Sequence, residues 1–414
     1  MNTATAAVRA GAGSFREVWV ISSGHALTHW YPATFYLLLP LIGKELGLSY
    51  AQIGFTMTMQ YLAGALANLP GGMVVDTVGR KGLLMALSLF WIGFPYLLMS
   101  LTHSYWMLLV CVVLVGIGNN LWHPTAISTL AHRFPDRKGL VLSLHGMGGN
   151  IGEAAAPLVI GALLAVLSWR EVVIVNIVPG VVMAAMILVF LGSLTLDAPH
   201  APANRTDGRS LGSYFSGFRR LLRNRAIILI SVSGVFRSMT QSSLLTFLPL
   251  YLGRELGYST FWIGAGMFAL QVAGFTSAPV SGHLSDRMGR RRVMISSMLM
   301  SAIVLVTMAL AGKSPAFIVL IAVLGFFLYA TRPVIQAWAL ECAPREMAGT
   351  AVGLLFGLQA VGASISPVVS GVIADAWGIY AVFYFLAATI VVANCLIFFM
   401  PKDAGEAAKP SLVS

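Results

Sequence analysis

The sequence GMVVDTVGRK at residues 72–81 recurs as GHLSDRMGRR at residues 282–291, which lies 210 positions further along the chain. Other segments share this spacing: LGLSYAQIG at 46–54 with LGYSTFWIG at 256–264, and Gly152 and Pro157 with Gly362 and Pro367. Because these separate matches all have the same spacing of 210 residues, the sequence indicates an internal duplication. We therefore expect two equivalent halves, a repeat architecture that occurs in membrane transporters.

The composition favours a membrane protein. Of the 414 residues, 57% are apolar and only 10% are charged, and the mean hydropathy is +0.82. A soluble protein carries roughly 25% charged residues. These values argue against a soluble enzyme, a disordered chain and a nucleic-acid-binding domain.

The chain contains enough apolar segments for an all-α protein with twelve transmembrane helices, because one crossing needs about 20 mostly apolar residues. The expected spans are 18–42, 51–75, 83–101, 105–131, 140–167, 172–194, 226–252, 261–284, 293–311, 316–340, 350–374 and 380–400. The polar stretch at 197–225 separates six spans from six. The expected domains are an N-terminal six-helix bundle at 1–195, a cytoplasmic linker at 196–225, a C-terminal six-helix bundle at 226–401 and a cytoplasmic tail at 402–414.

The positive charges predict the orientation of the chain. The two termini, the central linker and the loops on their side of the membrane hold 20 of the 26 Lys and Arg residues, and the opposite loops hold four. Cytoplasmic loops are enriched in Lys and Arg. We expect an inner-membrane, multi-pass protein with both termini in the cytoplasm, and this bias also explains the net charge of +11.

The repeated G-x-x-x-D-x-x-G-R-[KR] pattern resembles the loop signature of the major facilitator superfamily. The resemblance implies that fold and a conformational latch formed by Gly72, Asp76, Arg80, Lys81, Gly282, Asp286, Arg290 and Arg291. Gly72 and Gly282 would allow close helix approach. The two aspartates would accept hydrogen bonds from helix N-termini and arginines. The alternative is that the pattern serves only as a topology determinant.

A narrower resemblance points to the fosmidomycin-resistance branch of this superfamily, a group of drug exporters. It rests on WHP at 122–124, HGMGGNIGEAAAPL at 145–158 and LSYAQIG at 48–54. Trp122 and Thr125 depart from the F-H-P-E run of that branch, so its substrate does not transfer directly.

Energy coupling has few options in this sequence. No G-x-x-x-x-G-K-[ST] motif, metal-ligand spacing or catalytic constellation is present. We expect no cofactor, no metal site and no enzymatic activity. The prediction is a monomeric secondary transporter in the lipid bilayer, driven by protons, that moves a small molecule and binds no nucleic acid.

Polar residues inside the spans are the candidate site, because such residues are costly in a membrane and usually functional. The resemblance implies that spans 1, 4, 7 and 10 line a cavity and that spans 2, 5, 8 and 11 flank it. The candidate substrate-binding residues are His25, His29, Trp122, His123, Arg237, Gln241, Arg332 and Gln359. The candidate proton-coupling residues are Glu153, His123 and Asn150. Each histidine has the structural alternative of bonding a neighbouring carbonyl.

Arg237 and Arg332 are the two cations within the spans, and no carboxylate lies mid-span in their half. Guanidinium groups bind carboxylate, phosphate or phosphonate through paired donors. The sequence therefore predicts an anionic or zwitterionic substrate clamped between the halves, carried by an exporter. An uptake symporter of the same fold and a non-transporting receptor or scaffold remain alternatives, as does bonding of each arginine to helix carbonyls or to Glu153.

Overall fold

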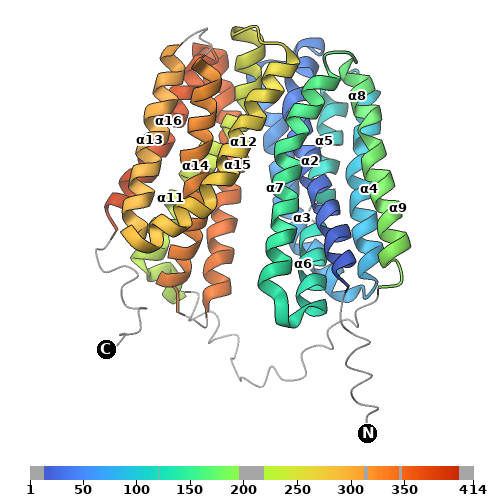
Figure 1. Ribbon diagram of the computed structural model, residues 1–414. Helices are drawn as coiled ribbons and strands as arrows, with labels where there is room; N and C mark the ends of the chain where they lie inside the picture. The colour runs from blue at the N-terminus through green and yellow to red at the C-terminus, as the bar shows by residue number, and fades with distance from the viewer. Residues whose placement is uncertain (1–13, 120, 195–218, 312–315, 345–346, 401–414) are drawn as a thin grey trace, which may run out of the picture. The chain divides into compact units, whose positions relative to one another are not determined.

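The computed structural model describes residues 14–119, 121–194, 219–311, 316–344 and 347–400 (Figure 1). The first half contains α2 (Phe15–Glu45), α3 (Tyr50–Thr77), α4 (Lys81–Ser100), α5 (Tyr105–Asn119), α6 (Trp122–Arg133), η1 (Pro135–Arg137), α7 (Lys138–Leu163), α8 (Trp169–Val175) and α9 (Ile177–Leu191). The second half contains α11 (Arg225–Leu250), η2 (Tyr251–Glu255), α12 (Thr260–Met288), α13 (Arg290–Ala311), α14 (Ala316–Cys342), α15 (Ala348–Trp377) and α16 (Tyr380–Phe398). These residues contain no β-strand.

The predicted spans correspond to these helices. Span 105–131 is divided between α5 and α6, and span 172–194 between α8 and α9; each other span matches one helix. Eight helices of the described chain are long and apolar enough to cross a membrane on length and composition alone. Most of the expected linker lies outside the described residues, and residues 219–223 at its end are helical.

Contacts divide the chain into two compact units. One unit consists of residues 1–47, 59–202 and 259–268, and the other of residues 48–58, 203–258 and 269–414. The short segments 48–58 and 259–268 are the starts of α3 and α12, and each clusters with the unit that does not contain the rest of its helix.

The first unit is organised by α2, which packs against α7, while α4 packs against α5 and α9 (Figure 1). Glycines permit the close approach of α2 and α7. A Cβ atom at Gly152 would lie 1.9 Å from the carbonyl oxygen of Ala26, and one at Gly148 would lie 2.3 Å from that of Ser22. Small residues that bring backbones together are the usual basis of helix packing in membranes.

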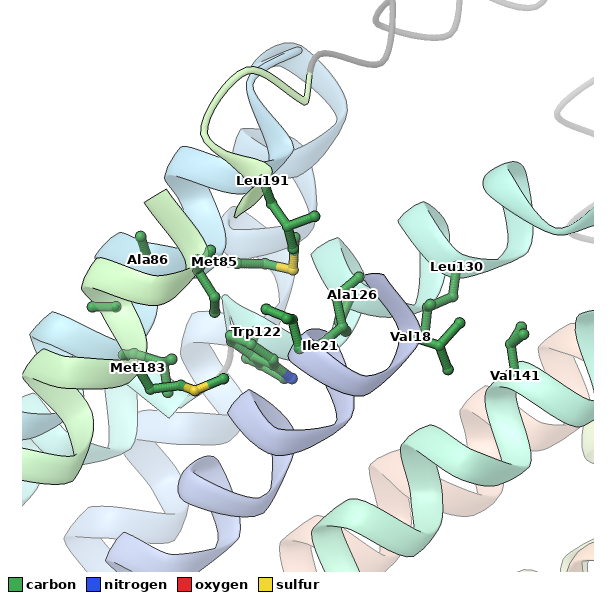
Figure 2. Packing of buried hydrophobic residues seen from close by; sticks show 14 of the residues in the cluster. Val18, Ile21, Met85, Ala86, Trp122, Ala126, Leu130, Val141, Met183 and Leu191 are labelled. Carbon is green, nitrogen blue, oxygen red and sulfur yellow. The ribbon is translucent and has the colours of Figure 1, made fainter. Parts of the chain in front are cut away.

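An apolar core fills one part of this unit. Figure 2 shows Ile21, Met85, Trp122 and Met183 converging from α2, α4, α6 and α9. Dispersion contacts in such a core are individually weak but numerous, and they fix the helices against one another. The helices that carry the candidate histidines are therefore held on a packed support.

In the second unit α11 packs against α15 and α16, and α13 packs against α14 and α16. Hydroxyl groups join α11 to its neighbours: the Oγ atoms of Ser243 and Ser366 lie 2.7 Å apart, and the Oγ1 atoms of Thr240 and Thr389 lie 2.9 Å apart. Hydrogen bonds of this kind stabilise helix pairs where no water competes.

The internal duplication is visible in the backbone. Gly47 and Gly257, which occupy equivalent positions, have φ angles of +62° and +69° in the left-handed region that favours glycine. A Cβ atom at Gly54 would lie 2.1 Å from the carbonyl oxygen of Pro367, and one at Gly264 would lie 2.2 Å from that of Pro157. The glycine of each repeat thus packs against the proline of the other repeat, so the same contact occurs twice.

Candidate functional site

Four histidines come together in the first unit, from three different helices. His25 and His29 lie on α2, His123 on α6 and His145 on α7. The ring centroid of His25 lies 4.8 Å from that of His29, 5.0 Å from that of His123 and 3.8 Å from that of His145. The i,i+4 spacing of the first pair places both rings on one face of α2.

His25 is the centre of this cluster. Its Nδ1 atom lies 2.6 Å from the carbonyl oxygen of His145, and its Nε2 atom lies 3.2 Å from Nε2 of His123. A carbonyl can only accept, so Nδ1 of His25 carries the proton. In the neutral ring Nε2 then has no proton, and its lone pair is directed at His123 as a hydrogen-bond acceptor.

Glu153 adds a carboxylate to the cluster. Its Oε2 atom lies 3.6 Å from Nδ1 of His29, and the two side chains are 18% and 30% exposed. Tyr61, which hydrogen-bonds to Tyr36 through its hydroxyl group, also interacts electrostatically with Glu153. A carboxylate and an imidazole this close can exchange a proton or bind the same cation.

His145 was not predicted to be a site residue. Its ring is buried and stacks on His25 with an interplanar angle of 11°, and its ring nitrogens have no hydrogen-bond partner among the described residues. The sequence feature that could have indicated its place in the cluster is the adjacent GMGG run at 146–149. A Cβ atom at Gly149 would lie 2.7 Å from Cε1 of His25. Glycine at this position provides the space for the histidine rings.

The other two predicted residues of this unit fall outside the histidine cluster. Trp122 is fully buried in the apolar core of Figure 2, and its ring lies against Gly24. The substrate-binding role of Trp122 stays a prediction, and in this structure its side chain is fully buried. The Asn150 side chain is exposed and makes no hydrogen bond within the described chain.

A second polar cluster surrounds Arg237 of α11. The residue is 3% exposed; Nη1 donates to Oε1 of Gln241 at 2.9 Å and Nη2 donates to Oε1 of Gln359 at 3.4 Å. Nε of Arg237 and Nε2 of Gln359 have no partner among the described residues. Amide oxygens thus contact the guanidinium group, instead of the helix carbonyls or Glu153 considered from the sequence.

Arg332 lies on α14 and its side chain is exposed. It is close enough to Arg237 for the two positive charges to interact. Within the described residues neither arginine forms an ion pair with a carboxylate. The second unit therefore holds concentrated positive charge that its own side chains do not neutralise.

The second copy of the loop motif forms an ion-pair network. Nη1 of Arg290 lies 2.6 Å from Oδ1 of Asp286, and Nη2 lies 2.8 Å from Oε1 of Glu341 on α14. Arg291 donates from Nη2 to the carbonyl oxygen of Phe398 at 2.5 Å. The motif thus joins α12, α13, α14 and α16 at one end of the unit.

The predicted role of Gly282 in close helix approach stays a prediction. No described atom lies within 4 Å of a Cβ atom placed at Gly282. In the first copy of the motif Arg80 is exposed, whereas Lys81 is buried and donates from Nζ to the carbonyl oxygen of Val75. Gly72 and Asp76 lie outside the side chains that the structure describes.

Two bundles of apolar helices related by duplication, each with a polar cluster among its helices, define a multi-pass membrane transporter. The sequence profile described as Major Facilitator Superfamily matches residues 21–276 and 232–413. The chain belongs to the major facilitator superfamily. It is a non-enzymatic transporter of small molecules with the fold of that family.

Similarity to individual relatives extends over most of the chain. The fosmidomycin resistance protein of Escherichia coli is 25% identical over 94% of this chain and 94% of its own length. The phosphoglycerate transporter protein of Salmonella typhimurium is 25% identical over 88% of this chain and 83% of its own length. A crystal structure of a bacterial homologue of the human lysosomal transporter Spinster has a TM-score of 0.81, covers 93% of this chain and 97% of its own, and is 16% identical.

Proposed function

We propose that this protein is a proton-coupled exporter of small anionic or zwitterionic solutes, located in the inner membrane with both termini in the cytoplasm. The observation that carries the proposal is the environment of Arg237, a buried guanidinium group whose hydrogen bonds among the described residues go to neutral amide oxygens.

An uncompensated cation within a span has a cost. Insertion scales place Arg at a helix centre at about 2.5–3.5 kcal/mol. Arginine cannot relieve this cost by losing its proton. Gln241 and Gln359 orient the guanidinium group but leave its charge in place. A bound anion would neutralise the charge and use the planar fork of donors.

Glu153 and the neighbouring histidines support proton coupling. The carboxylate lies 3.6 Å from His29 in the interior of the first unit, and a group in such a place changes its charge when it binds or releases a proton. Of the three residues predicted to couple protons, Glu153 and His123 remain in the proposal. Asn150 does not titrate and is exposed, so we assign it no role in coupling.

The name of one relative agrees with an anionic substrate, and the name of another bears on the direction of transport. One is named for phosphoglycerate transport and another for fosmidomycin resistance. Resistance favours export, and the branch resemblance of residues 145–158 favours the same direction. Proton-coupled uptake is the second candidate, because the name of the phosphoglycerate relative states no direction of transport.

The substrate experiment measures uptake into everted vesicles, with and without a pH gradient, over a panel of phosphorylated, carboxylated, zwitterionic and cationic compounds. Lysine keeps the charge of arginine but loses the fork. We expect Arg237→Lys to reduce transport at least tenfold, and Arg292→Lys, an exposed position on α13, to leave it unchanged. Normal transport by Arg237→Lys and Arg332→Lys, or a purely cationic substrate, would contradict the anion site.

Coupling is tested separately with Glu153→Gln. This variant should abolish uptake driven by the pH gradient while leaving counterflow exchange of the same compound partly intact. Glu255→Gln, at an exposed position outside the cluster, is the matched control. Wild-type gradient-driven flux in Glu153→Gln would remove Glu153 from the mechanism, and flux that the gradient drives only in the opposite direction would establish uptake.

A further inference from the structure

The histidine cluster of the first unit has the geometry of a metal site. One ring nitrogen from each of His25, His29 and His123 can be chosen so that all three lie within 4.8 Å of one another. We propose that these three imidazoles bind one divalent transition-metal ion of the zinc class. The proposal goes beyond the transport function proposed above. The site shares His123 and Glu153 with the proposed proton-coupling group and is independent of the anion site at Arg237.

The distance between the two closest nitrogens supports this assignment. Zinc–imidazole bonds are 2.0–2.1 Å long, so two nitrogens on one tetrahedral ion are separated by about 3.3 Å. The Nε2 atoms of His25 and His123 lie 3.2 Å apart, with ring planes at 87°. With the proton of His123 on its Nδ1 atom, both Nε2 atoms present lone pairs, and small adjustments of the rings would place an ion between them.

The outer contacts of the ligands have the pattern expected of metal-binding histidines. Such histidines direct the second ring nitrogen to a backbone carbonyl or a carboxylate, which fixes the tautomer and orients the ring. Nδ1 of His25 lies 2.6 Å from the carbonyl oxygen of His145, and Nδ1 of His29 lies 3.6 Å from Glu153. The hydrogen bond of His25 leaves its Nε2 atom available to the ion, and the carboxylate of Glu153 lies at ion-pair distance from His29.

The surroundings combine a buried ligand with partly accessible ones. His25 is 6% exposed, whereas the side chains of His29 and Glu153 are 30% and 18% exposed. His29 is therefore partly accessible, whereas His25 lies on a support fixed by packing. Three neutral imidazoles favour zinc, copper or nickel over magnesium and calcium, which prefer oxygen ligands. The carboxylate of Glu153 would offset part of the positive charge.

The test uses the full chain purified without a histidine tag and stripped with a chelator. Equilibrium dialysis against zinc, with elemental analysis, should find one ion per chain, and excess magnesium should not displace it. His29→Gln and His123→Gln should each weaken zinc binding at least tenfold. His132→Gln, an exposed histidine on the same helix as His123, should bind like the wild type.

X-ray absorption of the zinc form should show nitrogen ligands at about 2.0 Å with the outer scattering typical of imidazole. Wild-type protein that binds no more zinc than His29→Gln and His123→Gln would overturn the proposal, as would binding lost only in His132→Gln. Because His29 and His123 are only half-buried, their variants remain informative if His25→Gln fails to fold. Zinc binding needs no transported substrate, so its failure is distinguishable from failure of the proposed function.

Discussion

The carboxylate of Asp375 accepts a hydrogen bond from the backbone N–H of Tyr50 at 2.9 Å, although 325 residues separate the two in sequence. Its second oxygen accepts from the N–H of Ala51 at the same distance. These groups begin α3, where N–H donors have no partner within the helix and the helix dipole is positive. Asp375 thus caps a helix from another part of the chain, and the equivalent residue of the other repeat, Ala165, cannot do so.

We expect Asp375→Asn to lower stability by about 1 kcal/mol, because it keeps one acceptor but loses the charge that complements the helix N-terminus. Asp375→Ala should lower it further. Thermal unfolding in detergent, followed by intrinsic fluorescence, measures the shift in midpoint. Asp136→Asn, at an exposed position of η1, is the control. An unchanged midpoint in both Asp375 variants would mean that the cap does not contribute.

Glycine substitutions at two positions of α7, Gly152 and Gly146, should have opposite effects on stability. Gly152→Ala places a Cβ atom 1.9 Å from the carbonyl oxygen of Ala26, so we expect a loss of about 1–3 kcal/mol as α2 and α7 separate. At Gly146 nothing described lies within 4 Å, and Gly146→Ala should stabilise the helix by about 0.5–1 kcal/mol. Thermal midpoints of both proteins test this order, and equal effects would contradict close packing at Gly152.

The end of α2 should give the protein a pH-dependent contact. Hydrogen bonds from Arg170 and Trp169 hold the pKa of Glu45 below its ordinary value of 4.5. A carboxyl whose pKa is depressed in the folded state stabilises the protein above the unfolded value and loses that contribution as pH falls. The thermal midpoint of Glu45→Gln should therefore lie below that of the wild type at neutral pH.

The difference in midpoint between Glu45→Gln and the wild type should shrink as the pH falls below 4.5 and through the lower folded-state pKa. The contribution is modest because the Glu45 side chain is 43% exposed, and solvent screens such a pair. A difference that stays constant down to acid pH would show that Glu45 acts through its shape alone.

The predicted orientation is checked by labelling single cysteines in intact cells after Cys111, Cys342 and Cys395 have been replaced. We expect an impermeant thiol reagent to label His103→Cys, in the exposed turn between α4 and α5, and to leave Ser210→Cys in the central linker unlabelled. His103 is preferred to the adjacent Thr102, which is fully buried. The reverse labelling pattern would contradict cytoplasmic termini.

Sequence alone determined the membrane character, the approximate helix spans, the duplication and the superfamily. These follow from constraints that act along the chain: a spanning helix must be apolar over about 20 residues, and a repeat keeps its spacing. The rarity of polar groups within spans also marked His25, Glu153 and Arg237 as candidate site residues without any structure.

Tertiary structure decided which of these residues meet and what each contact does. His145 lies in the histidine cluster, and Trp122 lies in the apolar core. The rotation of α6 and α7 about their axes sets which of their side chains point at α2. Glu341 became the partner of Arg290 by the packing of α14 against α13. Helical periodicity gives the faces of each helix, but the choice of neighbour depends on packing between segments far apart in sequence, and no local pattern records it.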